Sequence, residues 1–177
     1  MVPEAKLVET EHGLVPEGEG WFVVNAREAA WGSRDEAFGA RTDFEGDTEF
    51  PEIGINIRVL EPGRPNGHYH GEIHQEAFLV LSGQCLLLVE GEERPLGAWD
   101  FVHLPPWTEH ILVGAGDAPC VVVMVGGRFD PDRILYPRVD VALRHGAGVE
   151  RDTESVEESY ADRPEPRRRR YREGDLP

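Results

Sequence analysis

The chain has 177 residues, of which 40% are hydrophobic, and this is enough for a single domain with its own core. Its formal net charge of −16 argues against nucleic acid and anionic membrane surfaces as partners. No apolar run reaches the roughly 20 residues of a membrane-spanning helix, and the first residues form no secretory signal, so we expect a cytoplasmic protein that crosses no membrane.

Changes in composition divide the chain into three segments. Residues 1–52 are expected to form an N-terminal extension with a leader, a short strand and a short helix. Residues 53–128 carry the core of the domain. Residues 129–177 form a C-terminal extension that ends in an arginine-rich tail.

The N-terminal extension begins with residues 1–20, whose content of Glu, Gly and Pro predicts a loose leader. Residues 21–24 are apolar and predict a short strand. Asn25 and Glu28 have the spacing of a capping box, which predicts that a short helix begins there. We expect Trp31, carried by this helix, to pack against the main body.

The hydrophobic period becomes two at the start of the core. Every second position there is apolar, which predicts a half-buried strand carrying Ile53, Ile55, Ile57 and Val59. Arg58 in this strand is read as facing solvent or a partner sheet. Further apolar runs, separated by turn residues, span 78–81, 84–89, 101–104, 111–113 and 120–125. Short strands with a turn every ~8–12 residues predict an all-β sandwich or small barrel rather than a parallel sheet.

The C-terminal extension contains two short helical signals and a basic run. Residues 139–145 predict a helix that ends at Gly146, and Ser155 predicts a capped turn of helix after it. Residues 167–170 are four arginines flanked by prolines, which predicts a disordered or surface tail because such a run cannot be buried. The alternative, that the run docks RNA or an acidic partner, is weaker in so acidic a chain.

Histidines cluster in the core. Five of the seven fall within 43 residues, at positions 68, 70, 74, 103 and 110. One residue separates His68 from His70, so in an extended strand both imidazoles point to the same side. Together with Glu76 and His110 they can form a nitrogen and oxygen cage that suits Fe, Mn, Ni, Cu or Zn. The sequence therefore predicts a metal site.

These residues resemble the paired motifs of the cupin superfamily. The stretch from His68 through Glu76 to Gly83 is similar to the first motif, in which His-x-His is followed by Glu and Gly. Residues 105–110 are similar to the second motif, which ends in histidine. The resemblance, over residues 53–125, implies an all-β cupin-type double-stranded β-helix, or jelly-roll barrel, with short helical N- and C-terminal extensions. It also implies that one divalent transition metal (Zn, Ni, Fe or Mn) is bound inside by His68, His70, Glu76 and His110.

The chain departs from the family pattern at several positions. Trp99 and Trp107 occupy the two glycine positions of the second motif, and Gly114 lies where asparagine is usual. Before the first motif, Pro62 replaces a glycine.

A further departure bears on the third ligand. Five residues separate His70 from Glu76, where the family has three or four. Glu76 keeps its spacing to Gly83 and is therefore the favoured ligand, while His74 is a substitute ligand or an acid–base group. The neighbouring Glu72 is read as an exposed loop residue.

Two functions remain open. The first is a metal-dependent enzyme acting on a small molecule, an oxygenase with Fe or an isomerase or lyase with Zn, Mn or Ni. Glu76 or His74 would then be the catalytic group that transfers protons. The second is a non-catalytic module that uses the metal to bind or sense a small ligand.

We also expect a homodimer. A barrel with open sheet edges exposes unpaired backbone groups unless something covers them. The segment of residues 21–60 carries more aromatic surface than one small barrel needs to bury. It should therefore supply much of a two-fold interface.

Overall fold

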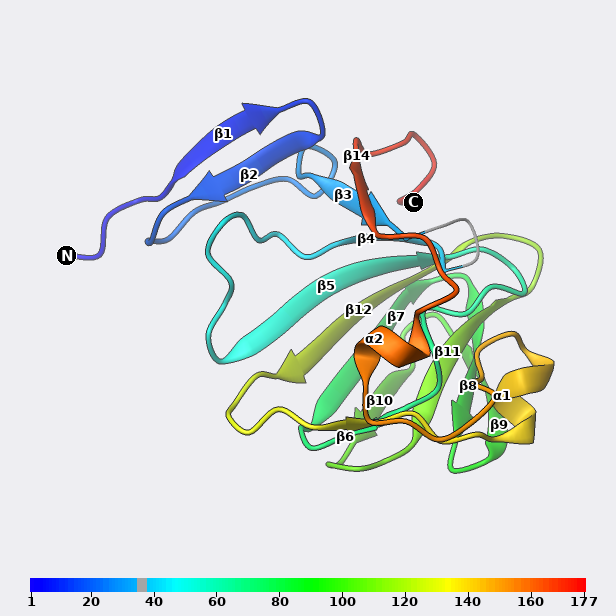
Figure 1. Cartoon of the computed structure of the whole chain (residues 1–177). Coiled ribbons are helices and arrows are strands. Elements are labelled where there is room, and N and C mark those ends of the chain that lie inside the picture. Colours follow the sequence, from blue (N-terminus) through cyan, green and yellow to red (C-terminus); the bar gives the residue numbers. More distant parts are fainter. Residues whose placement is uncertain (35–37) are drawn as a thin grey trace.

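The protein is described by a computed structural model that covers residues 1–34 and 38–177. Figure 1 shows a molecule built mostly of strands, with two short helices towards the C-terminal end. The predicted all-β class is confirmed. None of the helices in these two ranges has the length and apolar character needed to span a membrane.

One side of the barrel consists of four antiparallel strands, β5 (Ile53–Leu60), β7 (Glu76–Ser82), β10 (Phe101–Leu104) and β12 (Cys120–Gly127). Their order is β10-β7-β12-β5. Strand β12 is central because it pairs with both β5 and β7. It is also apolar along most of its length, as expected of a strand that is covered on both faces.

The opposite side consists of β8 (Gln84–Val89), β9 (Glu92–Gly97) and β11 (His110–Ala115), in the order β11-β8-β9. The chain passes from β7 to β8 through a tight turn at Gly83, where φ is +76° and an added Cβ would lie 2.5 Å from the carbonyl oxygen of Pro119. Only glycine fits such a position. Within residues 53–128, each apolar run that was predicted to be a strand lies within an observed strand.

The inner faces of the two sheets share one hydrophobic cluster, which includes Leu60, Phe78, Val80, Leu87 and Leu112. Neighbouring residues on the same strands pack outward. Val59 packs against Trp31 outside the first sheet, and Ile111 packs against Val141 outside the second. Because both faces of these sheets are covered, some barrel strands are continuous apolar runs in the sequence and do not alternate between apolar and polar residues.

The N-terminal extension differs from the sequence prediction. Residues 1–20 are not a loose leader, because β1 (Lys6–Thr10) and β2 (Gly13–Glu17) form an antiparallel hairpin there. The predicted strand at residues 21–24 and the helix after it are wrong as well. Asn25 caps an isolated turn, in which its side-chain oxygen accepts a hydrogen bond from the backbone N–H of Arg27. The capping signal was real, but no run of apolar residues at helical spacing follows it.

Two short strands, β3 (Trp31–Ser33) and β4 (Ala40–Thr42), extend the first barrel sheet beyond β5. Strand β14 (Arg167–Arg169) then pairs antiparallel with β3 at the far edge. Residues 167–170 are therefore not a disordered tail. Pairing uses the backbone alone, so the run joins the sheet while the side chains of Arg167 and Arg168 stay exposed.

The remaining elements are two short strands and two short helices. Strand β6 (Gly71–Glu72) pairs with β13 (Ile134–Leu135). Helix α1 (Asp140–Arg144) lies within the range predicted for it. Helix α2 (Val156–Ser159) follows Ser155, whose hydroxyl accepts a hydrogen bond from a backbone N–H of the first turn. Both predicted helices are confirmed.

Two tryptophans adopt a left-handed backbone conformation, with φ of 75° at Trp99 and 66° at Trp107. These are the two positions at which the cupin motif has glycine. A side chain with a Cβ costs about 1–2 kcal/mol in this region of φ/ψ space. The backbone thus keeps the conformation of the motif while the sequence has lost the residue that favours it.

Replacing Trp99 with glycine should stabilise the protein by about 1 kcal/mol, because the backbone strain is relieved. The side chain is 74% exposed, so little packing is lost with it. The measurement is the free energy of unfolding in urea. The control is Phe101→Gly, which also removes an exposed ring but places glycine in a strand and should destabilise. A Trp99→Gly variant no more stable than the wild type would contradict the strain argument.

The homodimer stays a prediction. Trp21, Val23 and Ile53 are 52%, 79% and 43% exposed, and all lie within the segment expected at the interface. Light scattering at micromolar concentration should then give about twice the 19.8 kDa of one chain. Val23→Asp should halve that mass, whereas Val156→Asp, at an exposed valine outside the segment, should leave it unchanged. A wild-type mass near one chain would rule the dimer out.

Candidate metal centre

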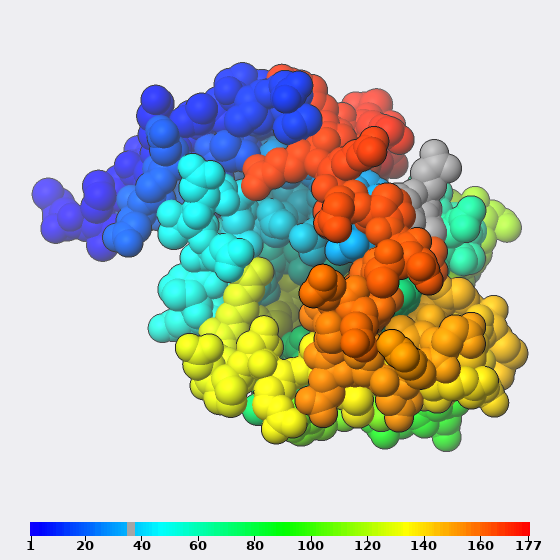
Figure 2. Space-filling model, in the orientation of Figure 1, coloured from blue at the N-terminus to red at the C-terminus, as the bar shows by residue number. Residues whose placement is uncertain are grey.

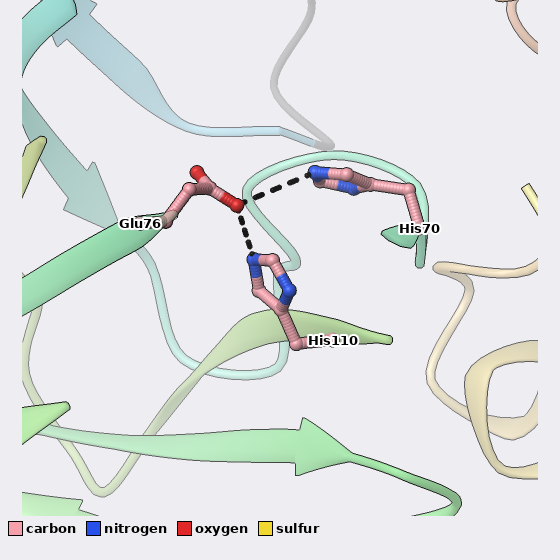
Figure 3. Close-up of side chains that lie close together, drawn as sticks. All are labelled: His70, Glu76 and His110. Carbon is pink, nitrogen blue, oxygen red and sulfur yellow. Dashed lines mark ion pairs between the residues drawn. The ribbon is translucent and has the colours of Figure 1, made fainter. Parts of the chain in front are cut away.

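Three of the predicted side chains converge, as Figure 3 shows: His70, Glu76 and His110. Oε2 of Glu76 lies 2.9 Å from Nε2 of His110 and 4.0 Å from Nε2 of His70. The ligand atoms of the three residues all lie within 4.8 Å of one another. Among residues 1–34 and 38–177, no other group of three or more His, Cys, Asp or Glu side chains is arranged in this way.

Backbone pairing positions the two histidines. His70 and His110 form an antiparallel bridge in which the two N···O distances are 3.1 and 2.8 Å. Side chains directly opposite each other in such a pair lie on the same face, and the two rings are 4.9 Å apart. Glu76 begins β7, where its neighbour across the sheet is Gly126. A glycine there leaves room for the carboxylate, because an added Cβ would lie 3.4 Å from Cγ of Glu76.

The hydrogen bonds of the rings fix which nitrogen is free. Nδ1 of His70 lies 2.7 Å from the carbonyl oxygen of His68, and Nδ1 of His110 lies 2.9 Å from that of Thr108. A carbonyl can only accept, so Nδ1 carries the proton in each ring. In the neutral rings Nε2 then holds a lone pair, and both lone pairs face Glu76. Histidines that bind metals donate their other N–H in this same way.

The three residues fit a metal ion. Two lone pairs and a carboxylate repel one another unless a cation, either a proton or a metal ion, lies between them. Oε2 of Glu76 is buried and makes no hydrogen bond to any described residue. Atoms bound at ~2.0–2.2 Å to one ion lie about 3–4 Å from each other, and the 2.9 and 4.0 Å separations match this. The donor set of two imidazoles and one carboxylate suits a divalent transition metal.

Without a metal, Glu76 and His110 form an ion pair, and a metal ion that binds here would displace the proton from Nε2 of His110. Burial, with a further contribution from His110, lowers the pKa of His70 to about 4, so this ring is neutral at physiological pH. Burial disfavours the charged forms of Glu76 and His110. The attraction between the two charged groups outweighs this effect of burial. The pKa of Glu76 is therefore held below its usual range, and the pKa of His110 is raised.

His68 is not brought into this group. The chain at residues 68–70 is not a strand, so the alternation that would point both imidazoles to one side does not apply. The ring of His68 stacks on Tyr160 instead, with centroids 4.4 Å apart and an interplanar angle of 6°. Its two ring nitrogens are buried and have no hydrogen-bond partner among the residues that the structure describes, and burial lowers the pKa of His68 to about 4.

His74 also lies outside the group. Its Nε2 lies 3.7 Å from a carboxylate oxygen of Asp132, and the backbone N–H of Phe129 donates to that nitrogen at 3.3 Å. These contacts engage the ring of His74 within the five residues that separate His70 from Glu76.

Sequence reasoning missed two residues near the centre. Glu72 is half-buried rather than exposed, and burial together with the charge of Glu76 raises the pKa of Glu72 to about 8. The signal for it was its position two residues after His70, which puts both on one side of an extended chain. Arg58 does not simply face solvent either, since its positive charge helps to lower the pKa of Glu76.

Aromatic rings flank the two imidazoles. The ring of Phe78 lies 5.4 Å from that of His110, and the ring of Tyr136 lies 5.8 Å from that of His70. Tyr136 in turn contacts Tyr160 at 6.1 Å. The centre is thus bounded by apolar surface, which strengthens electrostatic interactions within it.

Comparison with known proteins agrees with the motifs. Residues 56–126 match the family model for the cupin domain. With the barrel topology, this identifies residues 56–126 as a cupin domain. It is 38% identical over 128 residues to the quercetin 2,3-dioxygenase of Bacillus subtilis, an alignment that covers 72% of this chain but 36% of the relative. The chain thus spans little more than a third of the length of that relative.

Solved structures are similar over about half of the chain. One is a putative sugar phosphate isomerase from Acidithiobacillus ferrooxidans, with 32% identity, a TM-score of 0.45, and 47% of this chain and 55% of that one covered. Another is a sugar phosphate isomerase of the cupin superfamily from Silicibacter pomeroyi, with 27% identity, a TM-score of 0.45 and the same coverage.

Removing one imidazole should empty the site. In His110→Ala, bound metal measured by elemental analysis should fall from about one ion per chain to near zero, because two of three ligands cannot hold it. His103→Ala, which removes an exposed histidine on β10, should keep the metal. His68→Ala should also keep it, since its ring is stacked on Tyr160. Metal that survives in His110→Ala would exclude the site, and metal lost in His68→Ala would show that His68 is a fourth ligand.

Proposed function

We propose that the protein is a metal-dependent oxygenase acting on a small molecule, with one ion, iron in the active form, held by His70, Glu76 and His110. Two imidazoles and one carboxylate that leave the remaining positions open are the ligand set of non-haem Fe(II) oxygenases. The observation that carries the proposal is the convergence of two Nε2 lone pairs on the carboxylate of Glu76. A bound ion would supply Lewis acidity and a template for substrate and O₂.

The oxygenase type is favoured over an isomerase or lyase by the relative named quercetin 2,3-dioxygenase. That relative extends well beyond the aligned region, so its substrate is a starting point for assays here. Small phenols and flavonols are the first compounds to test.

The chain's own residues would orient and insulate the reaction. The carbonyls of His68 and Thr108 hold the imidazoles with Nε2 free. The rings of Phe78 and Tyr136 limit the access of water. Of the two acid–base groups expected from the sequence, Glu76 lies in the centre and serves as ligand or proton acceptor. His74 is engaged with Asp132, and we assign it no step.

The test is oxygen consumption by protein loaded with Fe(II) without air and then mixed with aerated quercetin or smaller phenols. We expect O₂ uptake that matches substrate loss with iron but not with zinc, because zinc has no redox chemistry. The His110→Ala variant should be inactive, and His103→Ala should retain activity. Substrate-dependent uptake that persists in His110→Ala would place the reaction elsewhere.

The second candidate is a binding or sensing module, in which the metal holds a ligand without turning it over. The hydrogen bonds that orient the two ligand rings would serve this role equally well. Saturable binding of a phenol to the iron form with no O₂ uptake would favour the module and contradict the oxygenase.

A further inference from the structure

A second feature of the molecule is a cavity of about 400 Å³ that does not include the three residues of the metal centre. Strands β3, β4 and β5 form one part of its wall, and Tyr160 and the start of β14 form another. Figure 2 shows the C-terminal segment, in orange and red, lying across the blue and cyan segments that contain these strands. The volume is within the range of small-molecule sites.

The wall of the cavity is strongly basic. Its described residues include one carboxylate, that of Asp43. They also include five arginines, namely Arg34, Arg41, Arg58, Arg167 and Arg168. The whole chain, by contrast, carries a net charge of −16 with 34 acidic residues. Positive side chains are therefore concentrated at this cavity although the protein as a whole is strongly negative.

Most of these guanidinium groups have no counter-charge. Arg41 lies 3.7 Å from Asp43, but the other four form no ion pair with any described carboxylate. Elsewhere the arginines find partners readily, for example Arg94 with Glu92 at 2.6 Å and Arg138 with Asp140 at 3.0 Å. Like charges brought together repel one another, and among the described residues of this wall Asp43 is a single carboxylate beside five arginines.

Arg58 is the most deeply placed of the five. Its Nε is buried and has no hydrogen-bond partner within residues 1–34 and 38–177. Burial, and then the charge of Arg41, lowers the pKa of Arg58 to about 10, so the group is still protonated at neutral pH. A buried, charged donor without an acceptor is costly, and an anion in the cavity would remove that cost.

Arg58 also connects the cavity with the metal centre. It lines the cavity, and its charge acts on both Glu76 and His70. Tyr160, which also lines the cavity, stacks on His68 and lies under the guanidinium of Arg34 at 4.5 Å. Arg58 is therefore a cavity residue whose charge is also felt at two of the three residues of the metal centre.

We propose that this cavity binds the oxyanion group, a carboxylate or a phosphate, of the small-molecule substrate, and that Arg58 is its principal contact. This assigns a substrate class to the proposed function and rests on it. Arg34, Arg167 and Arg168 complete the site as further charges from separate parts of the chain.

The test is calorimetric titration of the metal-loaded protein with benzoate, with inorganic phosphate, and with benzamide as the neutral analogue of benzoate. We expect saturable binding of benzoate to one site and none of benzamide. Arg58→Gln should weaken benzoate binding at least tenfold, while Arg94→Gln, at an exposed arginine outside the cavity, should not change it. Equal binding of benzoate and benzamide, or full benzoate affinity in Arg58→Gln, would overturn the proposal.

Two further arms keep the result interpretable. Arg167→Gln/Arg168→Gln alters only exposed side chains and should weaken benzoate binding severalfold without unfolding the protein, even if Arg58→Gln proves unstable. The metal-free His70→Ala/His110→Ala variant should still bind benzoate, so a failure of the oxygenase proposal is distinct from a failure here. Benzoate binding that disappears in that variant would assign the anion to the metal and overturn the cavity site. Phosphate binding without benzoate binding would assign the cavity to a free inorganic anion and overturn its role in substrate binding.

Discussion

The antiparallel backbone bridge between His70 and His110 is the interaction on which the metal centre depends. It places two imidazoles on one face of the pairing and leaves each Nδ1 within reach of a carbonyl two residues earlier in its own strand or loop. The ring orientation therefore comes from local backbone geometry, which the two sheets of the barrel hold in place. Glu76 has only to begin the neighbouring strand β7 opposite a glycine for the carboxylate to meet both Nε2 atoms.

The barrel could be predicted from the sequence because its strands are long, apolar and separated by turns. Three of the four expected ligands also follow from the motif, since His70, Glu76 and His110 are each fixed by strand pairing. His68 could not be placed in this way. Its backbone N–H donates to the hydroxyl of Tyr160, 92 residues further along the chain, and its ring stacks on the same side chain. No local pattern contains that contact.

The strands of the N- and C-terminal extensions were also not predictable from local sequence patterns. The basic run Arg167–Arg169 has no hydrophobic period, yet its backbone completes the edge of a sheet by pairing with β3. Strand propensity describes how side chains fit a half-buried surface. It therefore cannot predict a strand whose side chains remain in solvent. The left-handed Trp99 and Trp107 are a related case, because the barrel imposes a conformation that these residues do not favour.

The strands that cover the edge of the first barrel sheet also form part of the cavity wall. An open edge at β5 would leave backbone groups unpaired, and β4, β3 and β14 cover it in succession. Strands β4 and β14 bring Arg41, Arg167 and Arg168 to the cavity that Arg58 of β5 lines. Hydrophobic packing of Trp31 against Val59 stabilises these edge strands and offsets the repulsion among the arginines. The edge strands can therefore keep a group of positive charges beside the barrel, and those charges are available to an anionic ligand in the cavity.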